Sequence, residues 1–178
     1  MNQRIRLTKR LLYESLLELL GDRTVEEISV KELCEHAGIN RSTFYAHFGC
    51  VRDVITEIGR EITEKVRDIC RREGSNPKIA LEQICEYLYR MKSTEMVLFR
   101  NHTDKELSSA FESLSAEFYH IGNFDIKPQD EKLTLAFINY GMFNLIKTWL
   151  TENIEKTPKE ISALLLDNIL KVNSGKCH

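Results

Sequence analysis

Apolar residues recur every three or four positions along most of the chain, the spacing that places them on one face of an α-helix. The clearest case is residues 51–72, where Val54, Ile58, Ile62 and Val66 follow this spacing without a break. At about 1.5 Å per residue, such a helix is roughly 33 Å long and can join two domains. The pattern therefore predicts an all-α protein with a long connecting helix.

The same spacing predicts further helices along the chain. They are expected over residues 8–20, in two short stretches between 29 and 48, and over 77–92, 94–101, 104–122, 129–152 and 158–172. The segment REGSNP at 72–77 combines Gly, Ser, Asn and Pro, which end helices and begin new ones. We therefore expect three parts: a three-helix head over residues 1–50, a connecting helix over 51–73, and a helical body over 74–178.

Two short helices around a tight turn are predicted for the segment SVKELCEHAGINRSTFYAHF at 29–48. Ser29 and Glu32 form the capping-box pattern that begins a helix. Gly38 can adopt the left-handed conformation that ends one. Phe44 and Phe48, four residues apart, then face the interior from the second helix.

That arrangement leaves a cation, hydroxyls, a phenol and an imidazole on the outer face of the second helix. Such groups suit phosphates and base edges in the major groove of DNA, as in a helix-turn-helix recognition helix. A polar helix face that is merely solvated is the ordinary alternative. The outward residues are Arg41, Ser42, Thr43, Tyr45 and His47.

The net charge of −2 argues against non-specific coating of nucleic acid but leaves room for a local basic surface. Residues 1–10 contain Arg4, Arg6, Lys9 and Arg10 and no acid. We expect a basic arm that touches phosphates, with a solvated tail as the alternative. Residues 1–10 also lack the apolar core of a signal peptide, and no apolar run approaches the length of a membrane span. A cytoplasmic location is expected.

The 5 cysteines are an odd number and show no CxxC spacing, which predicts free thiols. Cys34 and His36 lie two residues apart and point in different directions on a helix, so we expect no metal site. For Cys50, near a helix start, a redox-active thiol and an ordinary exposed thiol both remain open. The cysteines are Cys34, Cys50, Cys70, Cys85 and Cys177.

The segment LTLAFINYGMFNLIKTWL at 133–150 is apolar around most of its circumference. A helix of this kind must be covered on two sides. With the apolar final helix, it suggests a homodimer interface of two-fold symmetry through about residues 129–172. The alternative is a central core helix in a monomer.

Residues 4–58 resemble the DNA-binding domain of the TetR family of bacterial transcriptional regulators, through the basic first helix, TVEEISVKELCEHAGINRSTFYAHF and the apolar helix that follows. GMFNLIKTWLTENIEKTPKEI is similar to the C-terminal part of some short members. The resemblance implies a homodimer that binds a palindromic operator on double-stranded DNA and usually represses. It also implies that a ligand entering the body moves the fourth helix and changes the separation of the heads.

The resemblance also implies roles for single residues. Ser42, Thr43 and Tyr45 contact bases or phosphates, His47 contacts phosphate, and Lys31 reaches the DNA backbone. Many members have a phosphate-binding lysine at the start of the fourth helix, where this chain has Val51. Arg52 is a substitute for that contact, and Lys9 is the arm residue expected to meet DNA.

An apolar or aromatic effector is the expected ligand of the body, and no cofactor or metal is expected. Packing in the core is the alternative for each residue that could line its pocket. Those residues are Tyr87, Met91, Met96, Phe99, His102, Phe111, Phe118, Phe137, Tyr140 and Phe143.

Two other functions are alternatives to this one. A helical dimer acting through protein contacts, without specific DNA binding, is the main alternative to a regulator. An enzyme is disfavoured because the chain has no glycine-rich phosphate loop, no HExxH motif and no Ser or Cys with an evident base beside it.

Overall fold

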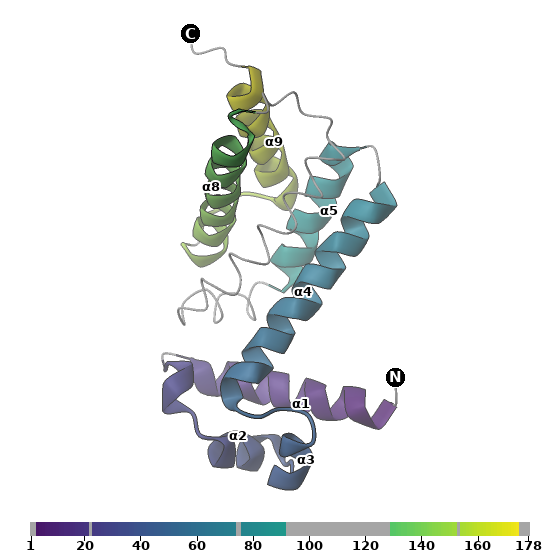
Figure 1. Cartoon of the computed structure of the whole chain (residues 1–178), viewed down its shortest axis with the longest axis vertical. Helices are drawn as coiled ribbons and strands as arrows, with labels where there is room; N and C mark the ends of the chain where they lie inside the picture. Colours follow the sequence, from purple (N-terminus) through teal and green to yellow (C-terminus); the bar gives the residue numbers. More distant parts are fainter. Residues whose placement is uncertain (1–2, 22, 74–75, 92–128, 153, 175–178) are drawn as a thin grey trace.

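The computed structural model describes residues 3–21, 23–73, 76–91, 129–152 and 154–174, and every element in them is helical. Figure 1 shows a helical head at one end, a long helix leaving it, and a helical body at the other end. The all-α prediction is therefore confirmed. The elements are α1 (Gln3–Leu20), the 3-10 helix η1 (Val25–Glu27), α2 (Val30–Ala37), α3 (Arg41–Tyr45), α4 (Val51–Glu73), α5 (Pro77–Arg90), α8 (Glu131–Thr151) and α9 (Pro158–Ser174).

The head is built on a small core shared by α1, α2 and α3. Leu12, Leu16, Leu33 and Phe44 are fully buried in it. Local signals set the boundaries of α2: Ser29 Oγ accepts a hydrogen bond from the Glu32 amide at 3.1 Å, and Gly38 ends the helix with φ of +63°. A Cβ at that φ would be strained, so the turn between α2 and α3 depends on glycine.

Two helix boundaries in the head differ from the predictions. Helix α1 begins at Gln3 rather than residue 8, so Arg4 and Arg6 belong to its first turns and do not form an arm. Nothing in QRIRLTKR interrupts a helix, and Arg, Leu and Lys favour one. Helix α3 ends at Tyr45 rather than residue 48, and a turn follows in which the amides of His47 and Phe48 both donate to the Phe44 carbonyl at 2.9 Å.

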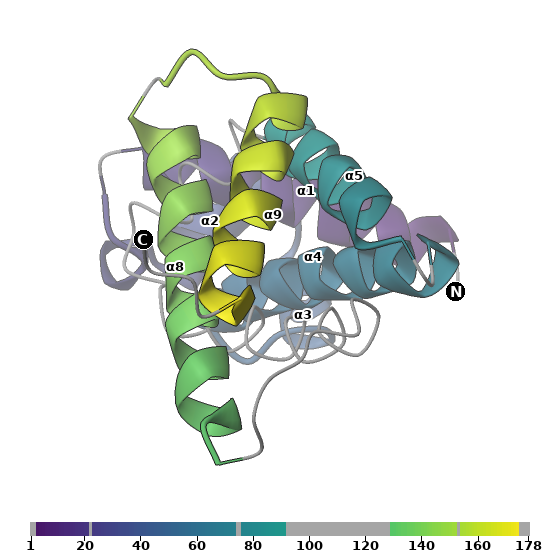
Figure 2. The ribbon, with the colours of Figure 1, turned by 90° about the horizontal axis from the view of Figure 1, so that it is seen from above.

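Helix α4 leads from the head into the body, where it packs against α5 (Figure 1). Its buried side chains include Val54, Ile58, Ile62 and Val66, as the apolar spacing predicted. Seen from above, α9 lies between α5 and α8 (Figure 2). The helices predicted over 94–101 and 104–122 lie outside the described residues.

One polar contact and one stacking contact fix α8 in the body. The fully buried Trp149 donates its indole N–H to the Lys156 carbonyl at 2.9 Å, in the segment that leads to α9. Its ring stacks on Tyr89 of α5, with centroids 5.4 Å apart and an interplanar angle of 16°. The opposite side of α8 remains exposed, including Leu133 at 76%.

Candidate nucleic-acid interface

The polar side chains of α3, the second helix of the helix-turn-helix, face outward because two aromatic side chains, one on α3 and one in the turn after it, pack in the core. Phe44 is fully buried and Phe48 is 6% exposed, and their ring centroids lie 5.7 Å apart. Tyr45 packs edge-on against Phe44 at 5.5 Å, yet 59% of it is exposed. The predicted inward pair is therefore confirmed. The outward set is also confirmed on the surface, with Arg41, Ser42 and Tyr45 exposed and Thr43 and His47 half-buried.

Two hollows flank this helix. The hollow between α1 and α3 has a volume of about 310 Å³, and the hollow between α2 and α3 about 560 Å³. Both hollows are lined in part by hydroxyl groups and cations, which suit phosphate oxygens. The first hollow is lined by Arg4, Ile5, Thr8, Ser42, Thr43, Ala46 and His47, and the second by Lys31, Cys34, Glu35, Ile39, Asn40, Arg41 and Ser42.

Thr8 and Asn40 also line these hollows, and neither was predicted from the sequence. Thr8 is 8% exposed, and its hydroxyl donates to the Arg4 carbonyl at 3.1 Å. Arg4 and Thr8 are four residues apart on α1 and so share one face. The signal was present in the sequence, but it required knowing that α1 begins at Gln3.

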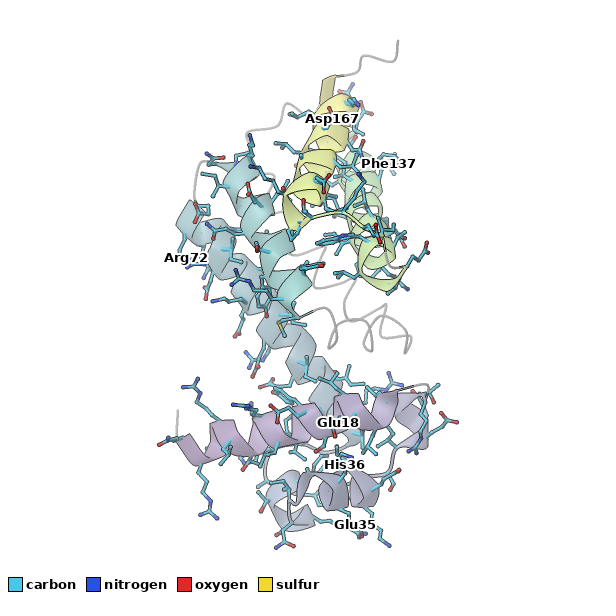
Figure 3. The ribbon with its side chains drawn as sticks, turned by 180° about the vertical axis from the view of Figure 1, so that it is seen from behind. Glu18, Glu35, His36, Arg72, Phe137 and Asp167 are labelled. Atoms are coloured by element: carbon cyan, nitrogen blue, oxygen red, sulfur yellow. The ribbon has the colours of Figure 1, made fainter. Side chains whose placement is uncertain are left out.

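The cations near this surface are balanced by carboxylates. Lys31 Nζ lies 3.9 Å from Glu35 Oε1 in an exposed pair one helical turn apart. Glu35 is at the far end of the head from the body (Figure 3). Arg52 forms an ion pair with Glu26 of η1. Pairs this exposed contribute little to stability and can exchange a carboxylate for a phosphate.

The start of α4 is capped from within. The Asp53 carboxylate accepts hydrogen bonds from the amides of Gly49, at 2.8 Å, and Cys50, at 3.0 Å, and these bonds lower the pKa of Asp53. Two amides that could otherwise face a phosphate therefore already have a negatively charged partner.

Lys9 is placed differently from our expectation. Its side chain is 18% exposed, its ammonium group donates to Glu57 of α4, and it lies over the Phe48 ring, 5.9 Å from the centroid. Lys9 thus joins α1 to α4 in the structure rather than projecting toward solvent.

A polar contact also ties the ends of α1 and α2 together. His36 Nε2 lies 3.6 Å from Glu18 Oε2, and the two side chains approach each other between the helices (Figure 3). This contact is an ion pair only when His36 is protonated.

The predicted pocket residues that the structure describes differ in burial. Tyr87 and Met91 are half-buried at the end of α5, and Phe143 is buried at 5% exposure. Phe137 and Tyr140 of α8 are 67% and 53% exposed (Figure 3 labels Phe137). Those outside the described residues are Met96, Phe99, His102, Phe111 and Phe118.

The thiol prediction is confirmed for the cysteines that the structure describes. Cys34, Cys70 and Cys85 are buried and form no disulfide, and burial raises the pKa of Cys85 to about 12. Cys50 is exposed and free, and Cys177 lies outside the described residues. In the same part of the chain, no three His, Cys, Asp or Glu side chains come together as a metal site would need.

Two family models match the chain. One, described as bacterial regulatory proteins of the tetR family, matches residues 6–55, and the other, a transcriptional regulator C-terminal region of the same family, matches residues 75–171. The chain belongs to the TetR family. Its head is accordingly a DNA-binding helix-turn-helix, and regulators of this family are transcription factors rather than enzymes.

Several solved structures share this fold. A TetR transcriptional regulator from Streptococcus agalactiae is 19% identical, with a TM-score of 0.69 over 94% of this chain and 96% of that one. NalD, the secondary repressor of a multidrug efflux pump in Pseudomonas aeruginosa, is 15% identical, with a TM-score of 0.69 over 96% and 98%. The dihydroxyacetone kinase operon activator DhaS is 11% identical, with a TM-score of 0.67 over 94% and 96%.

A search of curated proteins gave no match. Across the described stretches of this TetR-family protein, no helix combines the length and apolar character needed to span a membrane.

Proposed function

We propose that this protein is a ligand-responsive repressor that binds a palindromic operator as a homodimer. The observation that carries the proposal is the exposed recognition surface of α3 between two polar hollows. A helix in the major groove has a phosphate backbone on either side, which matches one hollow on each flank. Tyr45 and Thr43 would then meet base edges, while the hollows receive phosphates.

The hollows suggest how the contacts are divided. Between α1 and α3, Arg4, Thr43 and His47 supply a cation, a hydroxyl and an imidazole. Between α2 and α3, Lys31 and Arg41 supply cations, and Ser42 borders both hollows. Arg52 would add a further phosphate contact by exchanging its partner Glu26 for a phosphate. The phosphate contacts fix register, and the base contacts supply the sequence preference.

The homodimer is proposed from the exposed apolar surface of α8 and α9. Leu133, Phe137 and Tyr140 follow helical spacing on α8 and are more than half exposed, and Leu164 and Leu170 of α9 are 40% and 49% exposed. A second copy of the chain meeting this surface across a two-fold axis would cover it. The two heads would then read half-sites about one turn of DNA apart, or a multiple of it.

An apolar small molecule is the proposed effector. A related repressor from Thermus thermophilus, 17% identical with a TM-score of 0.57, is in complex with lauroyl-CoA, so this fold accommodates an acyl ligand in that protein. In this chain, Phe143, Tyr87 and Met91 offer apolar surface in the body. The effector would act by binding more tightly to a conformation whose heads do not fit the operator.

Selection of random DNA duplexes by the purified protein, at two salt concentrations, tests the proposal. Enrichment of a palindrome, with affinity that falls as salt rises, is the expected result. A folded, dimeric protein that enriches no sequence would contradict it and favour a role through protein contacts. A reporter controlled by the selected operator then tests repression, since DhaS shows that an activator can also have this fold.

A further inference from the structure

A continuous series of contacts links the second turn of α4 to Tyr45, the exposed recognition residue of α3. The Glu57 carboxylate of α4 accepts a hydrogen bond from the ammonium of Lys9, which lies 5.9 Å from the Phe48 ring centroid. The Phe48 ring lies 5.7 Å from Phe44, and Phe44 contacts Tyr45 edge-on at 5.5 Å. Three parts of the head that are distant in sequence are thus joined through Lys9.

The α4 end of this series is held firmly. Arg60 donates Nε to Glu57 Oε2 at 2.7 Å and Nη2 to Oε1 at 2.8 Å, so a two-pronged pair fixes the carboxylate plane. This pair with Arg60, and then Lys9, hold the pKa of Glu57 at about 2. The carboxylate is therefore charged at neutral pH and moves with α4.

A second contact fixes the rotation of α4 against α1. The Tyr13 hydroxyl donates to Glu61 Oε1 at 3.2 Å, one helical turn beyond Lys9 on α1 and one turn beyond Glu57 on α4. Two contacts one turn apart restrain a helix against rotation as well as sliding.

The α3 end has little freedom to respond independently. Phe44 and Phe48 are 0% and 6% exposed, so neither ring can shift without its neighbours. A cation over an aromatic face is attracted by the ring's electron distribution, and this attraction depends on its position over the ring. A displacement of Glu57 would therefore move Lys9 relative to Phe48 and change the packing beneath Tyr45.

We propose that Lys9 is a positioning residue that couples the placement of α4 to the orientation of the recognition helix, and that it does not contact DNA. This inference rests on the proposed function, because orientation is read out as operator affinity. It also assigns the response of the head to a specific set of side chains: Glu57, Lys9, Phe48, Phe44 and Tyr45.

Glu57→Gln gives the sharpest test, because a pure charge effect and loss of the positioning contact change operator affinity in opposite directions. Removing an acid near DNA strengthens binding if only charge matters. Loss of the positioning contact weakens operator binding, and we expect about fivefold or more. Glu64→Gln is the matched control, since Glu64 is exposed and pairs with Arg60 on the same helix. Tighter operator binding by Glu57→Gln, or equal behaviour of the two variants, would overturn the proposal.

Lys9→Met distinguishes positioning from a phosphate contact. It should weaken operator binding while leaving the slope of log affinity against log salt unchanged, whereas loss of one phosphate contact lowers that slope by about 0.9. Lys9→Arg, which keeps a cation for Glu57, should retain most of the affinity. A lowered slope in Lys9→Met would assign Lys9 to the DNA contacts instead.

Amide hydrogen exchange separates failure of this inference from failure of the proposed function, because it needs no DNA. In Glu57→Gln, exchange at His47 and Phe48, whose amides bond to the Phe44 carbonyl, should be faster than in wild type and in Glu64→Gln. Unchanged exchange in a folded variant would overturn the coupling, whether or not the protein selects an operator.

Discussion

Arg52 at the start of α4 forms an ion pair with Glu26 of η1, although the two residues are 26 positions apart in the sequence. The side chains are 49% and 60% exposed, so water competes with the pair. The cation that we expected to replace the family's usual lysine therefore has a carboxylate partner within the protein. Binding to phosphate requires it to exchange that partner.

Glu26→Gln should strengthen DNA binding, because it removes both a competitor for Arg52 and a negative charge on the head. We expect affinity to rise several-fold for the operator and for random duplexes alike, with a steeper salt dependence. Fluorescence anisotropy at several salt concentrations measures both effects. Glu86→Gln, an equivalent change on α5 of the body, should have no effect, and equal gains from the two variants would exclude exchange at Arg52.

Tyr45→Ala should weaken specific binding by about 1–3 kcal/mol and relax the base preference at one position of each half-site. Tyr45 is 59% exposed, so the melting temperature should change little. Tyr45→Phe separates the hydroxyl from the ring. Unchanged operator affinity in Tyr45→Ala would show that α3 is not the reading helix.

Lys31→Ala should weaken binding to all sequences alike and reduce the salt slope by about 0.9, as expected for one lost phosphate contact. Glu35→Gln is its counterpart, since Glu35 lies 3.9 Å from Lys31 and competes with phosphate. The Glu35→Gln variant should bind all DNA sequences more tightly than wild type. A selective loss at one base pair in Lys31→Ala would identify Lys31 as a base contact instead.

Features of the head that depend on neighbouring residues were predictable from the sequence. Ser29 and Glu32 cap a helix, Gly38 ends it, and Phe44 with Phe48 face inward, because each pattern acts within one or two turns. The start of α1 was misplaced because its first residues favour a helix as strongly as those that follow.

Contacts between distant segments were not predictable. The pairs of Lys9 with Glu57 and Arg52 with Glu26 join residues 48 and 26 positions apart. A charged residue looks the same in sequence whether it faces solvent or a carboxylate on another helix. Only the crossing of α1 over α4 decides that Lys9 points inward, and the apolar spacing of each helix does not determine how the two helices cross.

Phe137→Glu should disrupt the proposed homodimer, since it places two like charges near a two-fold axis on a surface that is otherwise apolar. Sedimentation velocity should show a shift from dimer to monomer, and operator affinity should fall with it. Ile79→Glu on α5 alters another exposed apolar residue, 42% exposed, and should leave the dimer intact. A dimeric Phe137→Glu variant would place the interface elsewhere.

The pKa of Glu57, lowered from 4.5 to about 2 chiefly by its hydrogen bonds from Arg60, predicts a pH dependence of stability. A carboxylate with a lowered pKa in the folded state stabilises it above pH 4.5, and that contribution is lost as the pH falls from about 4.5 toward 2. Because water screens this partly exposed carboxylate, the contribution amounts to about 1 kcal/mol at neutral pH. Urea unfolding should show Glu57→Gln less stable than wild type at pH 7, with the difference narrowing below pH 4.5. A difference that stays constant with pH would contradict this.

The length of α4 has a mechanical consequence. Its 23 residues form one uninterrupted helix from the head to the body, so it acts as a rigid lever about 34 Å long. A tilt of only about 6° about one end displaces the other by roughly 3.5 Å, close to the rise of about 3.4 Å per base pair in DNA. In the proposed homodimer, two such helices would each carry one head. Tilts too small to disturb the packing at either end of α4 would then shift the spacing of the two heads by whole base pairs relative to the half-sites of the operator.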